Sequence, residues 1–223
     1  MRIAVIGTHS TGKTTLTSQM FAYASKNGLN AHYIHEVARS CPLPLNEAFN
    51  VEAATWIASK QMTLEIEARA KKYDFIICDR SCFDPIVYAI NKFGYEMKSA
   101  SLYRNSMLYK YAQHVLESYD TIINVRPSLH EIKNDGIRST DPEFQKDIYE
   151  LFEQELKYLK IGFVHYKERV PFKLHNKYHF MNSDEVFNDD LSEFFEYIFH
   201  KGDVGDSFSS GQLIYSCPSI CRG

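Results

Sequence analysis

The chain has 223 residues, of which 44% are hydrophobic and 24% charged, a size and composition that suit one well-buried domain and not two. Its formal net charge of -3 excludes a global positive field that would gather nucleic acid or an anionic membrane, so any anion site must be local. Five cysteines without a CxxC pair argue against a disulfide scaffold, and we expect a cytoplasmic protein.

The apolar residues alternate between short runs and helical patterns. The first run, 2–6, predicts a buried strand, because it is too short for a signal-peptide core or a membrane span. Further strands are predicted at 31–35, 75–78 and 121–125, with a last one at either 163–166 or 179–182. Helical patterns cover 13–26, 46–71, 85–92, 101–117, 141–160 and 185–199. This alternation predicts an α/β fold, with a parallel sheet of about five strands and helices on both faces.

The turn after the first strand matches the phosphate-binding pattern G-x-x-x-x-G-K-[ST]. It lies between a predicted strand and a predicted helix, as the pattern requires, and comprises Gly7, Thr8, His9, Ser10, Thr11, Gly12, Lys13 and Thr14, with Thr15 following. The glycines allow backbone angles that direct successive N–H groups into one concavity. We expect Lys13 to contact the β- and γ-phosphates of ATP and the Thr14 hydroxyl to bind Mg²⁺. The pattern therefore predicts a P-loop NTPase fold.

The rest of the chain narrows the class of P-loop protein. A GTPase needs an N-K-x-D guanine clamp, whereas the candidate segment at 176–179 reads Asn-Lys-Tyr-His and lacks the aspartate. Assembly ATPases usually carry two adjacent acidic residues after the metal-binding strand, whereas here Asp79 is followed by Arg80. Both departures favour kinase chemistry.

Four residues stand at or just after the ends of predicted strands, and they are Gly7, Glu36, Asp79 and Arg126. Ligands of parallel sheets bind at the carboxyl ends of the strands, so we expect these positions to converge on one cleft. Asp79 is the candidate for the Mg²⁺ site together with Thr14, because Mg²⁺ prefers oxygen ligands.

Three short motifs carry a resemblance to known kinases over about residues 1–200. Asp79-Arg80-Ser81 resembles the [DE]-R-[SYH] element of deoxynucleoside and thymidylate kinases. Glu36-Val37-Ala38-Arg39 is similar to the E-x-x-R element of the ribosylnicotinamide kinase domain of the bacterial NAD regulator and its related ATPase-like family. The segments 135–138 (Asp-Gly-Ile-Arg) and 141–144 (Asp-Pro-Glu-Phe) are similar to the lid of that family. The resemblance implies an ATP- and Mg²⁺-dependent kinase of a small nucleoside-like acceptor, such as a nucleoside or a ribosylnicotinamide-like molecule.

The resemblance also implies roles for individual residues. Glu36 would be the base or would orient the acceptor hydroxyl, with Asp79 as the competing base. Arg39, Arg80 and Arg126 would bind the acceptor, since guanidinium groups suit phosphate and carboxylate geometry. Arg138, in a lid over about 126–141, would close onto the phosphates and join Lys13 among the catalytic residues.

Other readings remain open. The first is a nucleoside monophosphate kinase resembling thymidylate kinase, and the second is a regulatory ATP-binding module that switches a partner contact. The acidic net charge disfavours nucleic acid as a partner, no membrane partner is expected, and a homodimer is left open. We expect one kinase domain over 1–200, followed by a flexible tail over 201–223 that is rich in Gly and Ser.

Overall fold

The computed structural model describes residues 1–45, 48–94, 104–127 and 141–166, together with 172–174, 177–179 and Phe195. Most of the expected lid, including Arg138, lies outside these residues. The predicted closing helix over 185–199, apart from Phe195, and the tail over 201–223 also lie outside them.

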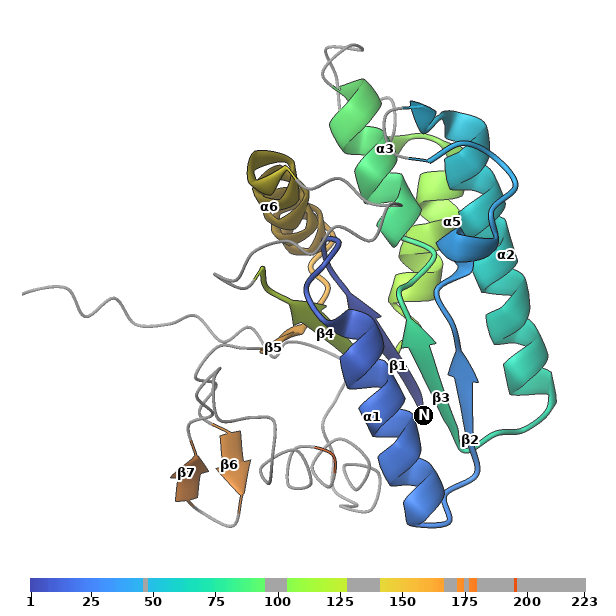
Figure 1. The fold of residues 1–223 in the computed structure, drawn as a ribbon, viewed down its shortest axis with the longest axis vertical. Coiled ribbons are helices and arrows are strands. Elements are labelled where there is room, and N and C mark those ends of the chain that lie inside the picture. The colour runs from blue at the N-terminus through green and yellow to red at the C-terminus, as the bar shows by residue number, and fades with distance from the viewer. Residues whose placement is uncertain are drawn as a thin grey trace, which may run out of the picture.

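A parallel sheet of five strands forms the centre of the fold, as the sequence predicts (Figure 1). The strand order is β2-β3-β1-β4-β5, and every neighbouring pair is parallel. The strands are β1 (Arg2–Ile6), β2 (Ala31–Ile34), β3 (Phe75–Asp79), β4 (Thr121–Val125) and β5 (Val164–Tyr166). The sequence left two positions open for the last strand, and the one at 164–166 joins the sheet. The strands β6 (Phe172–Leu174) and β7 (Lys177–His179) form a separate antiparallel pair.

Helices cover both faces of the sheet. Helix α1 (Lys13–Lys26) lies on one face, and α2, α3 and α5 lie on the other (Figure 1). Their bounds are α2 (Val51–Ala70), α3 (Asp84–Gly94) and α5 (Met107–Leu116), followed by α6 (Pro142–Tyr158), and the short 3-10 helix η1 (Val37–Ser40) follows β2. None of the helices in the described part of the chain combines the length and apolar character that a bilayer crossing requires.

The alternation of side chains along β1 explains why the sheet needs cover on both faces. Ile3 and Val5 pack with Leu16 and Met20 of α1 in one hydrophobic cluster. Ala4 and its neighbours on the other face pack in a second cluster with α2, α3, α5 and α6. Because every second residue points to the opposite face, the apolar run over 3–6 requires helices on both sides of the sheet.

Two helices begin later than their apolar patterns predict. Helix α2 begins at Val51 and not near 46, because the Asn50 side chain accepts a hydrogen bond from the Ala53 N–H and caps the first turn. Helix α5 begins at Met107, where Ser106 caps Tyr109 in the same way. Helix α6 begins with a cap of the same kind, since Asp141 accepts from the Glu143 N–H and Pro142 is the first helical residue.

Candidate active site

The phosphate-binding loop connects β1 to α1 at the carboxyl edge of the sheet. Gly7 has a φ of 125°, and a Cβ added there would lie 2.8 Å from the Val125 carbonyl oxygen, so no side chain fits. Gly12 has a φ of 85° at the start of α1. The two glycines therefore occupy the backbone positions of the motif that need them.

Lys13 is buried at the start of α1, although it carries a charge. Its Nζ donates to the Thr8 carbonyl oxygen and, at 3.1 Å, to the Thr11 hydroxyl. Burial, and after it the charge of Arg80, lowers the pKa of Lys13 well below its ordinary value. A bound phosphate anion would offset this cost, so the site is suited to an anionic ligand.

The Thr14 hydroxyl meets a buried carboxylate from the next strand. It donates to Asp79 Oδ2 over 2.7 Å, and Asp79 is only 1% exposed at the end of β3. The other carboxylate oxygen, Oδ1, is buried and has no hydrogen-bond partner among the described residues. A buried carboxylate oxygen without a donor is costly unless a cation satisfies it. A hydroxyl beside a carboxylate also offers the hard oxygen ligands that Mg²⁺ prefers, so Thr14 and Asp79 fit this ion.

Tyr33 of β2 forms a second contact with the same carboxylate. Its hydroxyl donates to Asp79 Oδ2 over 3.4 Å and lies 3.0 Å from the Thr17 hydroxyl of α1. Burial is the largest cause that raises the pKa of Tyr33, so the phenol stays protonated and can act as a donor at neutral pH.

Glu36, directly after β2, is held between two arginines. Arg80 Nε donates to its Oε1 over 2.6 Å and Arg39 Nε to its Oε2 over 2.9 Å. Arg80 also contacts Asp84 Oδ1 at 3.2 Å. The second oxygen of Asp84 accepts from the N–H and the hydroxyl of Ser81. Glu36 thus keeps a fixed position in which both of its oxygens face guanidinium groups.

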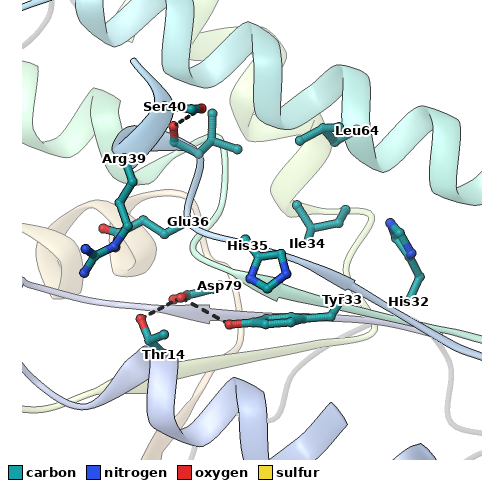
Figure 2. A pocket seen from close by; sticks show the side chains of 11 residues that line it. Thr14, His32, Tyr33, Ile34, His35, Glu36, Arg39, Ser40, Leu64 and Asp79 are labelled. Carbon is teal, nitrogen blue, oxygen red and sulfur yellow. Dashed lines mark hydrogen bonds and ion pairs between the residues drawn. The ribbon is translucent and has the colours of Figure 1, made fainter. Parts of the chain in front are cut away.

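Glu36, Asp79 and Thr14 border the same cavity of about 430 Å³. Figure 2 shows the hydroxyls of Thr14 and Tyr33 directed toward Asp79, with the His35 ring beside that of Tyr33. The wall is formed by β2 and the segment that follows it, with one residue each from α1, α2 and β3. The lining residues are Thr14, His32, Tyr33, Ile34, His35, Glu36, Val37, Arg39, Ser40, Leu64 and Asp79.

The structure brings most of the predicted site residues together. The phosphate-binding loop, Glu36 and Asp79 lie at one edge of the sheet, and Arg39 and Arg80 both contact Glu36. Arg126, at the end of β4, instead lies against α6, with its guanidinium 4.0 Å from Glu153 and 5.9 Å from the centre of the Tyr149 ring. Arg138 lies outside the described residues.

Sequence reasoning did not select Tyr33, Thr17 or Asp84. The Asp84 position carries a local signal, because an aspartate three residues after Ser81 can accept from its N–H at the start of a helix. Tyr33 and Thr17 carry no such signal. In the sequence, each is an ordinary residue of its strand or helix, and only the folded chain brings the Tyr33 hydroxyl next to Asp79 and Thr17.

Comparison with known proteins supports the fold. Deoxyadenosine kinase from M. mycoides, solved with dCMP and a flexible dCDP, matches with a TM-score of 0.52 and 22% identity over 74% of this chain and 88% of that one. The NadR protein in complex with NR matches with a TM-score of 0.52 and 20% identity over 78% of this chain. The match covers only 48% of the NadR chain. The resemblance to these P-loop kinases, inferred from three motifs, is therefore confirmed at the level of the fold.

Sequence comparison points to a broader class than the structures do. No curated protein matches the chain. A family model described as an AAA domain matches residues 2–171, which include the phosphate-binding loop, Glu36 and Asp79. The chain therefore belongs to this family of AAA domains.

Proposed function

We propose that the protein is an ATP- and Mg²⁺-dependent kinase that transfers the γ-phosphoryl group to a small nucleoside-like acceptor. One observation carries the proposal: the oxygen pair of Thr14 and Asp79 and the carboxylate of Glu36 border one cavity beside the phosphate-binding loop. A cavity of about 430 Å³ falls within the range of small-ligand sites. A phosphoryl donor and an acceptor could therefore meet there.

The loop and Lys13 bind the triphosphate of ATP. The N–H groups at the start of α1 face the anion, and Lys13 exchanges its contacts with Thr8 and Thr11 for the phosphate oxygens. Thr14 and Asp79 would hold Mg²⁺, which would offset negative charge on the phosphates. Tyr33 holds Asp79 through Oδ2, while the buried Oδ1 has no donor among the described residues.

Transfer requires an oriented hydroxyl and a site for its proton. The acceptor oxygen forms a bond to the γ-phosphorus, while the bond from that phosphorus to the bridging oxygen breaks and ADP leaves with the electron pair. Glu36 accepts the hydrogen bond of the acceptor hydroxyl and receives its proton. Arg80 and Arg39 keep the carboxylate oriented for this role.

The acceptor class is supported by the solved structures of similar fold. The M. mycoides enzyme was solved with dCMP and dCDP, and NadR with NR. A nucleoside or a ribosylnicotinamide-like molecule is therefore the acceptor that we propose. Arg39, half of whose side chain is exposed at the cavity, could donate hydrogen bonds to the polar groups of such an acceptor.

The test is a product assay across nucleosides, ribosylnicotinamide and nucleoside monophosphates, with ATP and Mg²⁺. We expect phosphorylated product from at least one acceptor that carries no phosphate group, and a loss of product in Lys13→Ala by at least about a hundredfold. Lys26→Ala, at the exposed opposite end of α1, is the matched control and should behave as the wild type. Product from Lys13→Ala at the wild-type rate would contradict the proposal.

The family of AAA domains is broad, and its match favours a second candidate, a regulatory ATP-binding module. The same panel of acceptors separates this module from the proposed kinase, because a module would bind ATP and yield no phosphorylated small molecule from any acceptor. A nucleoside monophosphate kinase, the remaining alternative, would yield product only from the monophosphates.

A further inference from the structure

The peptide between His9 and Ser10, in the middle of the phosphate-binding loop, is held from outside the loop. Gln145 of α6 donates from Nε2 to the His9 carbonyl oxygen over 2.8 Å. Both residues are buried, with 6% of Gln145 and 3% of His9 exposed. Gln145 lies 136 positions away in the sequence, so this contact exists only in the folded chain.

The direction of this carbonyl sets the direction of the next N–H. The described peptide bonds are trans, and in a trans peptide the C=O of one residue and the N–H of the following residue point to opposite sides. A donor that fixes the His9 carbonyl therefore also fixes the Ser10 N–H. Ser10 lies within the motif whose main-chain N–H groups surround phosphates.

The conformation of Ser10 shows why this peptide needs support. Its φ is 56°, in the left-handed region that residues with a Cβ adopt at a cost. Gly7 and Gly12 meet positive φ without that cost, but Ser10 has no such freedom. Contacts from the surrounding fold must hold the serine in this conformation.

The His9 side chain is held by the same region. Its ring lies 5.6 Å from the Phe144 ring of α6, and its Nδ1 lies 3.3 Å from the Tyr88 hydroxyl of α3. The ring contacts fix the side chain of His9, while Gln145 fixes its carbonyl. Of these contacts, only the Gln145 hydrogen bond acts directly on the peptide that carries the Ser10 N–H.

We propose that Gln145 is a positioning residue for nucleotide binding, which holds the His9–Ser10 peptide so that the Ser10 N–H faces the triphosphate. The inference rests on the proposed nucleotide site but does not require transfer to an acceptor. It predicts that losing the Gln145 donor weakens the binding of the phosphate chain and leaves acceptor binding unchanged.

The test measures binding of a nonhydrolysable ATP analogue, and separately of inorganic tripolyphosphate, by calorimetry without acceptor. Gln145→Met keeps the length of the side chain and removes the donor, and Gln145→Glu replaces the amide by a carboxyl group. We expect both ligands to bind the two variants roughly tenfold more weakly, as for one lost hydrogen bond. In the active enzyme, KM for ATP should rise while KM for the acceptor stays the same.

Gln154→Glu is the matched control for charge, because it makes the same change at an exposed position of α6. It should bind both ligands as the wild type does, and melting temperatures show that each variant is folded. Wild-type affinity in folded Gln145→Met, or an equal loss in Gln154→Glu, would overturn the inference. So would a loss confined to the ATP analogue, since tripolyphosphate probes the loop alone. A wild-type protein that binds both ligands and phosphorylates no acceptor would refute the kinase proposal and leave this one standing.

Discussion

Glu36 and Glu65 are both buried carboxylates paired with an arginine, yet they lie in different surroundings. Glu36 has a side chain 5% exposed, contacts Arg80 and Arg39, and borders the cavity. The side chain of Glu65, on α2, is 1% exposed and lies 3.4 Å from Arg2. It also accepts from the Tyr119 hydroxyl at 2.5 Å and from Gln61 at 3.0 Å.

The difference shows which observations identify a site. Burial and an arginine partner occur in both places, so neither observation separates a functional carboxylate from a structural one. Only Glu36 shares a cavity with Asp79, whose Oδ1 has no partner among the described residues. Glu65 has three side-chain donors, and burial raises its pKa. We therefore propose that Glu36 acts on a ligand and that Glu65 belongs to the core.

The largest effect is expected at Asp79, the residue that sets the Glu36 region apart. Asp79→Asn removes the carboxylate charge that would bind Mg²⁺, so turnover should fall by about a thousandfold, and the rise in melting temperature on adding Mg²⁺ with an ATP analogue should disappear. Asp74→Asn, exposed just before the other end of the same strand, is the control. An unchanged Mg²⁺ response in Asp79→Asn would remove the metal site from the proposal.

Replacing the two glutamates by glutamine compares the regions directly. Glu36→Gln should lower turnover by about a hundredfold with little change in ATP affinity, because it removes a base that acts on the acceptor. Glu65→Gln should leave turnover per folded molecule unchanged. Steady-state kinetics with ATP and acceptor varied separately measures both. Equal losses in the two variants would mean that the regions do not differ in function.

The ion pair of Arg2 and Glu65 in the core should affect stability and not turnover. Arg2→Met leaves the buried Glu65 without its arginine, and the free energy of unfolding should fall by about 3 kcal/mol. Urea denaturation measures this loss, with Lys60→Met on the exposed side of α2 as the control. Activity of the molecules that remain folded should persist. A loss of activity larger than the unfolded fraction explains would connect this region to the site.

The smallest effect is a pH dependence of stability. Because burial raises the pKa of Glu65, the folded chain binds this proton more tightly than the unfolded chain. The free energy of unfolding of the wild type, relative to Glu65→Gln, should therefore decrease as the pH rises from the ordinary value of 4.5 through the raised pKa. Denaturation curves at a series of pH values test this. A difference that stays constant with pH would contradict it.

Local patterns were enough to predict the sheet and the phosphate-binding loop. The loop is eight consecutive residues, and its motif is recognised from the type and spacing of Gly7, Gly12 and Lys13 alone. Apolar runs likewise predicted the strands, because a strand buried on both faces carries mostly apolar side chains. The convergence of Glu36 and Asp79 followed from the parallel arrangement, because parallel strands all end at the same edge of the sheet.

Contacts between distant residues came only from the folded chain. The hydroxyl of Tyr33 meets Asp79, Arg126 lies against α6, and Gln145 reaches the His9 carbonyl. These contacts depend on strand order, register and the seating of helices, which an apolar pattern does not specify because many arrangements bury the same residues. Residue types and spacing therefore predicted which groups bind phosphate, while the packing of α1, β2 and α6 decided which side chains hold them in place.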